Sequence, residues 1–161
     1  MSKMRLRDET GQALVEAALT LPTLLVLILG AAELTRVIYM SIEVSNAAEA
    51  GALYGSQNTG TAVDMTGIQN AAQNDALDVY HFTGTKVAAT SSVACECEPA
   101  TPSGTPTTVL CSDNTTCSSA NLSMETTLTV NTSASITPII HIPGIPTKYT
   151  LYGQSVQKVL N

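Results

Sequence analysis

A chain of 161 residues is about the size of one domain, and residues placed in a membrane leave room for only one small folded core. The net charge is −6, and the 7 Lys and Arg residues are too few and too scattered to form the basic stripe that nucleic-acid binding requires. We therefore exclude nucleic acid as a partner.

The N-terminal segment joins a basic stretch to a long apolar run. Residues 1–11 include Lys3, Arg5 and Arg7, and Ala13 to Ala32 is almost unbroken apolar sequence. About 20 apolar residues are what a helix needs to cross a hydrocarbon core of about 30 Å. An ordinary signal peptide would have a shorter apolar region and an A-x-A-like cleavage site.

The charges around this run predict its orientation. Positive residues precede it and the remainder of the chain is net acidic. We therefore expect a single-pass protein of the inner (cytoplasmic) membrane, with the N-terminus in the cytoplasm and the C-terminal domain in the periplasm or outside the cell.

Two residues interrupt the apolar run, Glu16 and Pro22. A carboxylate costs about 2.5 to 3.5 kcal/mol at the bilayer centre and less near the interface, so Glu16 either snorkels to the headgroups or has a partner. If the chain were cut after Gly11, Gln12 would carry a new ammonium one helical turn from Glu16, and a staggered neighbouring subunit could pair its ammonium with this carboxylate. Pro22 removes one helix hydrogen bond and predicts a kink.

This opening resembles the cleavage region of type IV prepilins, in which a basic leader ends in Gly (here Gly11) and a Glu stands at the fifth mature position (here Glu16). The run from Gly11 to Gly55 looks like the TadE-like pseudopilins of tight-adherence (Tad) pili, with a Leu-Pro inside the helix, Glu33 at its far end, and a small-residue segment at 45–52. The resemblance covers the first third of the chain.

The resemblance implies a pseudopilin or minor pilin that takes part in pilus assembly. A prepilin peptidase would cut between Gly11 and Gln12, and Glu16 would direct assembly. The implied partners are that peptidase, other pilin or pseudopilin subunits, the pilus assembly platform and the membrane. The alternative is an unprocessed, signal-anchored envelope protein whose outer domain binds a ligand or partner, because a simple anchor needs neither Gly11 nor Glu16.

After Glu33 the apolar residues recur at spacings of three and four, which predicts that the helix continues beyond the membrane. The predicted stripe comprises Leu34, Val37, Ile38, Ser41, Ile42, Ser45, Ala48 and Ala52. Small residues at 47, 48, 51 and 52 would allow a helix or a sheet to approach closely. A second helix is expected from Thr61 to about Tyr80, with Met65, Ile68, Ala72 and Val79 on one face.

Alternation with a period of two predicts strands over 87–97 and 122–130, which we expect to pair in an antiparallel sheet. The proline content of 99–106 predicts a loop, and 107–111 could form a short edge strand after it. Three further prolines interrupt the chain before a last strand predicted at 148–159. The predicted fold is α+β: a leader (1–11), a transmembrane and amphipathic helix (12–56), and an exported domain (57–161) with a second helix and a small antiparallel sheet of three or four strands.

Four cysteines, Cys95, Cys97, Cys111 and Cys117, fall in one short Ser/Thr-rich stretch. This pattern is typical of an exported, disulfide-bonded module. The spacing lacks the paired C-x2-C of zinc sites and no His lies beside it, so disulfides are favoured over a metal. Cys95 and Cys97 share one face of a strand and would need distortion to bond each other, so we predict two bridges to Cys111 and Cys117, with the pairing open.

No arrangement of residues indicates catalysis. His81 and His141 are the only histidines, neither is accompanied by a recognisable nucleophile, and the glycines form no phosphate-binding loop. We therefore expect a structural subunit, not an enzyme, without a cofactor.

Overall fold

The structure is a computed structural model that describes residues 9–98, 105–112, 117–118, 122–139 and 146–160. Its contacts divide the chain into two compact units, residues 1–38 (unit 1) and residues 39–161 (unit 2). A single long helix, α1 (Glu9–Gly55), contributes to both units. The long N-terminal helix predicted from the sequence is therefore confirmed.

In unit 1, α1 is apolar and uncovered. Every residue from 11 to 32 is exposed, and the large side chains between Leu14 and Leu29 are each at least half accessible. Its mean hydropathy of 2.1 and its length are sufficient to cross a membrane. An exposed apolar surface of this extent would be unfavourable in water, so this part of the helix requires an apolar environment.

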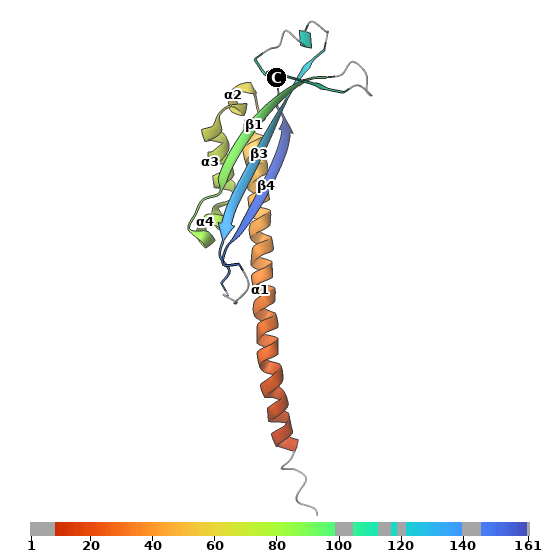
Figure 1. The fold of residues 1–161 in the computed structure, drawn as a ribbon. Coiled ribbons are helices and arrows are strands. Elements are labelled where there is room, and N and C mark those ends of the chain that lie inside the picture. The colour runs from red at the N-terminus through yellow and green to blue at the C-terminus, as the bar shows by residue number, and fades with distance from the viewer. Residues whose placement is uncertain (1–8, 99–104, 113–116, 119–121, 140–145, 161) are drawn as a thin grey trace, which may run out of the picture. The chain divides into compact units, whose positions relative to one another are not determined.

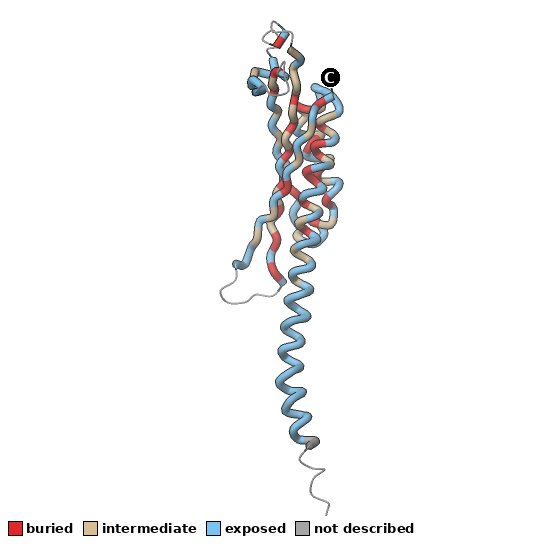
Figure 2. The backbone as a smooth tube through the Cα atoms, turned by 90° about the vertical axis from the view of Figure 1, so that its right-hand side faces the viewer, coloured by how far each residue is buried: buried red, intermediate tan, exposed pale blue. Residues whose placement is uncertain are grey.

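Unit 2 has two layers, with helices on one face of a four-stranded antiparallel sheet (Figures 1 and 2). The sheet has the order β2-β1-β3-β4. Its strands are β1 (Ala88–Cys97), β2 (Thr107–Val109), β3 (Met124–Ile136) and β4 (Tyr149–Lys158). The two strands predicted from the alternation are thus present and pair as expected, and the short edge strand and the last strand are present as well.

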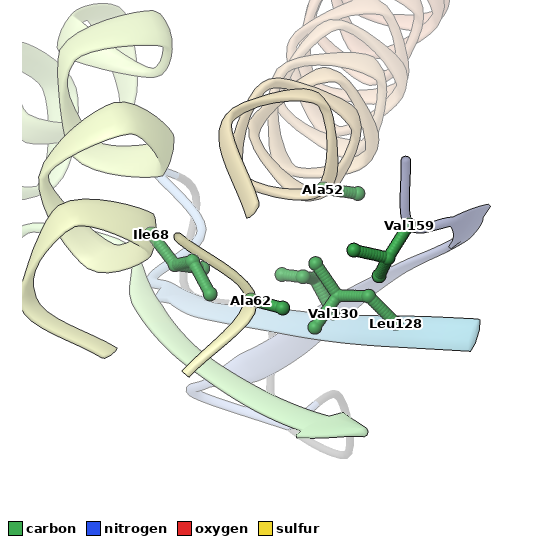
Figure 3. Packing of buried hydrophobic residues seen from close by; sticks show 6 residues of the cluster. All are labelled: Ala52, Ala62, Ile68, Leu128, Val130 and Val159. Carbon is green, nitrogen blue, oxygen red and sulfur yellow. The ribbon is translucent and has the colours of Figure 1, made fainter. Parts of the chain in front are cut away.

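The core of unit 2 lies between the second half of α1 and the inner face of β3. Alternate residues of β3 are buried because a strand turns every second side chain to the same face. The residues of one cluster are shown in Figure 3 and come from α1, α2, α3, β3 and the C-terminal end: Ala52, Ala62, Ile68, Leu128, Val130 and Val159. The outer face of β3 carries Thr, Ser, Asn and Glu.

Small residues let α1 approach the sheet, as the sequence predicted. Gly51 and Gly55 of α1 lie against Val130 and Leu128, and a Cβ added at Gly55 would overlap the Leu128 side chain. On the sheet side, Gly153 of β4 lies directly against the backbone of α1. A Cβ added to Gly153 would lie 2.5 Å from the carbonyl oxygen of Val44. The buried Thr132 hydroxyl donates to that same carbonyl at 2.6 Å.

The predicted stripe on α1 coincides with the buried face only at its distal end. The buried side chains of α1 are Met40, Val44, Ala47, Ala48 and Ala52, whereas Leu34, Ile38, Ile42 and Ser45 are exposed. The cause is that α1 is apolar on more than one face, so three-and-four spacing alone did not define which face meets the sheet. Only Ala48 and Ala52 are shared between the predicted and observed faces.

The predicted helix over 61–80 is instead three short helices. They are α2 (Thr59–Ala62), α3 (Met65–Asp75) and α4 (Leu77–Thr83). The first break occurs because the Asp64 carboxylate accepts a hydrogen bond from the Gly67 backbone N–H at 3.0 Å and so begins a new helix. Of the four residues expected on the inner face, Ile68, Ala72 and Val79 are buried but Met65 is exposed.

Candidate functional site

The predicted processing site lies near the start of α1. Gly11 and Gln12 are both exposed, and the helix already includes the two residues that precede Gly11. A Cβ built at Gly11 meets no atom within 4 Å, so the fold itself does not require a glycine there. A need for Gly11 would therefore come from a partner such as a peptidase.

Glu16 lies four residues after Gln12, which along a helix corresponds to a rise of about 6 Å. It is exposed between Leu14, Val15 and Leu19, whose side chains are 72%, 62% and 71% accessible. Within the part of the chain that the structure describes, its carboxylate has no hydrogen-bond or ion partner; only its backbone carbonyl accepts a bond, from the Thr20 hydroxyl at 3.0 Å. Glu16 is thus a charge on an apolar helix, without a partner among those residues.

Pro22 lies inside α1, and the helix is continuous through it. The missing N–H of Pro22 removes the bond that Ala18 would otherwise accept. Nearby, the Thr20 hydroxyl bonds the Glu16 carbonyl and the Thr23 hydroxyl bonds the Leu19 carbonyl at 3.1 Å. The predicted kink at Pro22 remains a prediction.

The apolar run ends at an ion pair. Arg36 Nη1 lies 3.2 Å from Glu33 Oε1, one turn apart on α1, and both side chains are mostly covered. This pair places two charges together at the point where the helix ceases to be uniformly apolar.

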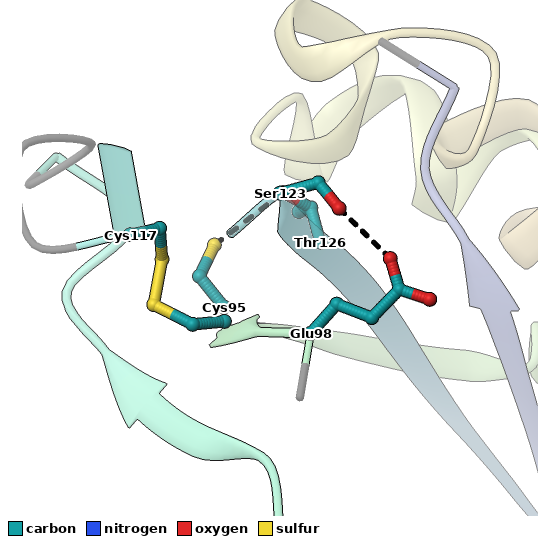
Figure 4. Close-up of a disulfide and its surroundings, with 6 residues drawn as sticks. Cys95, Glu98, Cys117, Ser123 and Thr126 are labelled. Carbon is teal, nitrogen blue, oxygen red and sulfur yellow. Dashed lines mark hydrogen bonds between the residues drawn. A yellow bond between two sulfur atoms is a disulfide. The ribbon is translucent and has the colours of Figure 1, made fainter. Parts of the chain in front are cut away.

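Both predicted disulfides form, and their pairing is Cys95–Cys111 and Cys97–Cys117, with sequence separations of 16 and 20. The first bridge attaches the turn after β2 to β1. The second attaches Cys117 to the last residue of β1, and Figure 4 shows this disulfide of Cys117. Cys95, Cys97 and Cys117 are buried, and Cys111 is exposed. Residues 99–104 of the predicted proline loop lie outside the described residues, while Pro106 immediately precedes β2.

The strand ends beside the bridges are joined by further contacts. The Ser123 hydroxyl donates to Glu98 Oε2 at 2.8 Å, and the Glu98 N–H donates to the Ser123 carbonyl at 2.9 Å (Figure 4). Lys158 of β4 pairs with Glu125 of β3 at 2.5 Å, and this contact raises the pKa of Lys158. These contacts hold the end of the sheet that carries the disulfides.

Sequence reasoning missed two polar contacts that attach the short helices to α1. The Tyr39 hydroxyl donates to Asp78 Oδ2 of α4 at 2.5 Å, and the Tyr54 hydroxyl donates to Asp64 Oδ2 at 2.8 Å. The Gly67 N–H and the Tyr54 hydroxyl together hold the pKa of the Asp64 carboxyl below its usual range. The only signal in the sequence was that acidic residues begin or precede short helices, which does not identify the tyrosine that each one meets.

No group of three or more metal-ligating side chains occurs among the described residues. His81 is exposed on α4, with its ring centroid 6.1 Å from that of Tyr80. His141 lies outside the described residues. The sites above therefore offer an exposed glycine near the start of α1, a carboxylate without a partner among the described residues, and a disulfide-bonded end of the sheet.

Comparison with known proteins bears on α1. A family model described as TadE-like protein matches residues 11–53, which begins at Gly11 and includes Glu16. No curated protein and no solved structure matches the chain. The N-terminal segment is therefore TadE-like, as its residues predicted, and this connects the protein in general terms with the machinery of the Tad pilus.

Proposed function

We propose that this chain is a pseudopilin or minor pilin that takes part in assembly of a tight-adherence pilus and acts as a structural subunit, not as an enzyme. The observation that carries the proposal is an uncovered apolar helix with Gly11 and Gln12 near its start, followed by Glu16, whose carboxylate has no partner among the described residues. All three residues lie inside the segment matched by the TadE-like family. In a subunit that moves from a bilayer into a helical bundle, Gly11 would serve processing, and the apolar helix and Glu16 would serve packing between subunits.

The proposed pathway begins in the inner membrane. Residues 1–11 remain in the cytoplasm, α1 crosses the bilayer, and unit 2 lies on the other side. Prepilin peptidase then cuts between Gly11 and Gln12. The disulfides support this topology, because such bonds persist in the oxidising compartments outside the cytoplasm.

In the assembled state, the exposed apolar residues of unit 1 would pack on the same segment of neighbouring subunits. The new ammonium of Gln12 on one subunit would meet Glu16 of another. Pairing two charges in an apolar medium removes the cost of leaving either one alone and fixes the stagger between subunits.

Processing is tested with a matched pair of glycine variants, Gly11→Leu and Gly30→Leu. Both glycines are on α1, and a Cβ built at either one meets nothing within 4 Å, so neither change disturbs the fold. Intact and N-terminal peptide mass spectrometry of the native membrane fraction should find Gln12 as the first residue in the wild type and in Gly30→Leu. Gly11→Leu should retain Met1. A wild-type chain that begins at Met1 would refute processing and favour the unprocessed, signal-anchored binding protein.

The role of Glu16 is tested by comparing Glu16→Gln with Glu49→Gln, since both glutamates are exposed on α1. We expect Glu16→Gln to be processed normally but to be lost from the purified pilus apparatus, while Glu49→Gln behaves as wild type. If Glu16→Gln co-purifies with the apparatus as well as wild type does, the charge-pairing role is wrong.

A further inference from the structure

The aromatic residues of this chain gather at one end of unit 2. We define the base of unit 2 as the end where β3 finishes and where β1 and β4 begin. The register places these points together, because Ile136 pairs with Tyr149 and Ser133 pairs with both Ala88 and Tyr152. Tyr149 and Tyr152 of β4 therefore lie at or near the base.

The helices add further aromatic residues to the same end. Along α1, Gly55 lies against Leu128, Gly51 against Val130, and Val44 accepts a bond from Thr132. The positions along α1 thus fall as those along β3 rise, so α1 and β3 run in opposite directions. Tyr39 precedes Val44 on α1 and therefore lies at the base. Its hydrogen bond to Asp78 brings α4 there as well, with Tyr80 and Phe82.

These rings are accessible. Tyr39 is 42% exposed, Tyr80 45%, Phe82 59% and Tyr152 74%. The chain has five Tyr and one Phe, so five of its six aromatic residues lie at the base. The sixth, Tyr54, lies on α1 beyond Gly51 and is bonded to Asp64. Contact with water alone does not favour the gathering of exposed aromatic side chains at one end of unit 2.

The length of the chain places the base close to a bilayer. The apolar run ends at Ala32, and Tyr39 follows seven residues later. Seven residues rise about 10 Å as a helix and reach no more than about 25 Å when fully extended. The headgroup region on each side of the hydrocarbon core is about 5 to 8 Å thick. Tyr39 therefore cannot lie far from the headgroups if α1 crosses the membrane.

Charge at the base is mixed. Lys86 lies two residues before β1, and Lys148 immediately precedes β4. Three carboxylates lie at the same end: Glu43 of α1 beside Tyr39, Asp75 of α3 and Asp78 of α4. Net charge thus gives little preference for an anionic surface. The aromatic rings are the shared feature, and Tyr side chains favour the interface because one end is apolar and the other polar.

We propose that the base of unit 2 rests on the headgroup layer of the bilayer that α1 crosses, with Phe82, Tyr80 and Tyr39 seated at headgroup level. The occupant of this surface is a zwitterionic phospholipid interface. This inference rests on the proposed membrane anchoring and goes beyond it, because anchoring alone does not require these aromatic rings to enter the headgroup layer. The contact would hold the subunit upright beside the assembly machinery before it leaves the bilayer.

The chain contains no Trp, so one substitution gives a single fluorescent reporter. Full-length protein carrying Phe82→Trp is reconstituted into phosphatidylcholine vesicles, with or without lipids brominated near the top of the acyl chains. Two reference variants are Leu110→Trp, at the disulfide end of the sheet and 75% exposed, and Val26→Trp, in the apolar half of α1 and 68% exposed. Tyr80→Trp repeats the test at a second position of α4.

Brominated lipid should quench Phe82→Trp and Tyr80→Trp, and their emission should shift to shorter wavelength relative to Leu110→Trp. Val26→Trp should also be quenched. If Val26→Trp is quenched but the two α4 reporters emit like Leu110→Trp, the lipid contact is wrong and the anchoring stands. If Val26→Trp is not quenched, the anchoring itself fails. A blue-shifted but unquenched α4 reporter would show contact with protein and would also overturn the proposal.

Discussion

Replacing Gly153 with Ala should destabilise unit 2 strongly, although the change adds a single methyl group. The added Cβ would lie 2.5 Å from the Val44 carbonyl oxygen, 2.6 Å from Thr132 Oγ1 and 2.9 Å from Ser45 Cα. Two of these atoms belong to the backbone of α1 and cannot rotate away. The strand must therefore separate from the helix or shift along it.

The size of the effect follows from three contributions. Overpacking of a well-packed core costs about 1 to 3 kcal/mol. Loss of the buried Thr132 to Val44 hydrogen bond adds about 1 kcal/mol. Replacing Gly with Ala also restricts the unfolded chain, which stabilises the folded state by about 0.4 to 1 kcal/mol. We expect a net loss of about 1 to 3.6 kcal/mol, a sizeable share of the roughly 5 to 15 kcal/mol that stabilises a typical domain.

The assay is guanidinium unfolding of the full chain in detergent micelles, followed by tyrosine fluorescence under non-reducing conditions. All five tyrosines lie in unit 2, so the signal does not report the apolar half of α1. Ser155→Ala, two residues along the same strand face, is the matched control and should cost little. Gly55→Ala should cost less than Gly153→Ala, because the atoms it meets are the ends of the Leu128 and Ile68 side chains.

A Gly153→Ala protein as stable as Ser155→Ala would refute the close approach of β4 to the α1 backbone. A second variant separates the causes. Thr132→Ala removes the hydroxyl but leaves the Val44 carbonyl in place, so adding it to Gly153→Ala should not restore stability. Full recovery in the double variant would mean that the hydroxyl, not the helix backbone, is what excludes a methyl group.

Three further outcomes are expected with the same unfolding assay or with hydrogen exchange. Replacing both Cys97 and Cys117 by Ser should lower the free energy of unfolding by about 3 kcal/mol, the usual effect of opening a loop of this length; no change would mean that the bridge constrains nothing. The lowered pKa of Asp64 in the folded state contributes stability at pH values above the ordinary pKa of about 4, and this contribution is lost as the pH falls through the folded-state pKa. On acidification, wild type should therefore lose more stability than Asp64→Asn. Equal losses would contradict the lowered pKa of Asp64. Tyr39→Phe removes the bond to Asp78 and should speed amide exchange in α4 but not in β3; uniform acceleration would point to general destabilisation instead.

Much of the architecture was predictable from local pattern. An apolar run of about 20 residues predicts a helix long enough to cross a membrane. Alternation with a period of two predicted β1 and β3, in which successive side chains turn to opposite faces of the sheet. The prolines before residue 148 indicated where β4 would begin. The cysteine spacing predicted two bridges, since Cys95 and Cys97 share the inner face of β1.

The errors occur where a pattern had more than one solution. The second half of α1 has apolar residues on several faces, and only contact with β3 selects Met40 and Val44 for burial instead of Ile38 and Ile42. The segment from 61 to 80 has helical spacing throughout, but the cap at Asp64 breaks it into shorter helices that can follow the sheet. Disulfide pairing was open because spacing limits which bonds can form without choosing among them.

The sequence by itself determined a basic N-terminal stretch, a long apolar helix, a cysteine-bearing sheet and a TadE-like segment. These are properties of neighbouring residues, which local chemistry decides. Only the tertiary structure decided that Gly153 meets the backbone of α1, that Asp78 finds Tyr39, and that five aromatic residues from α1, α4 and β4 share one end of unit 2. These residues are far apart in the chain, and their proximity depends on sheet register and on the face by which the helix packs, which no local pattern contains.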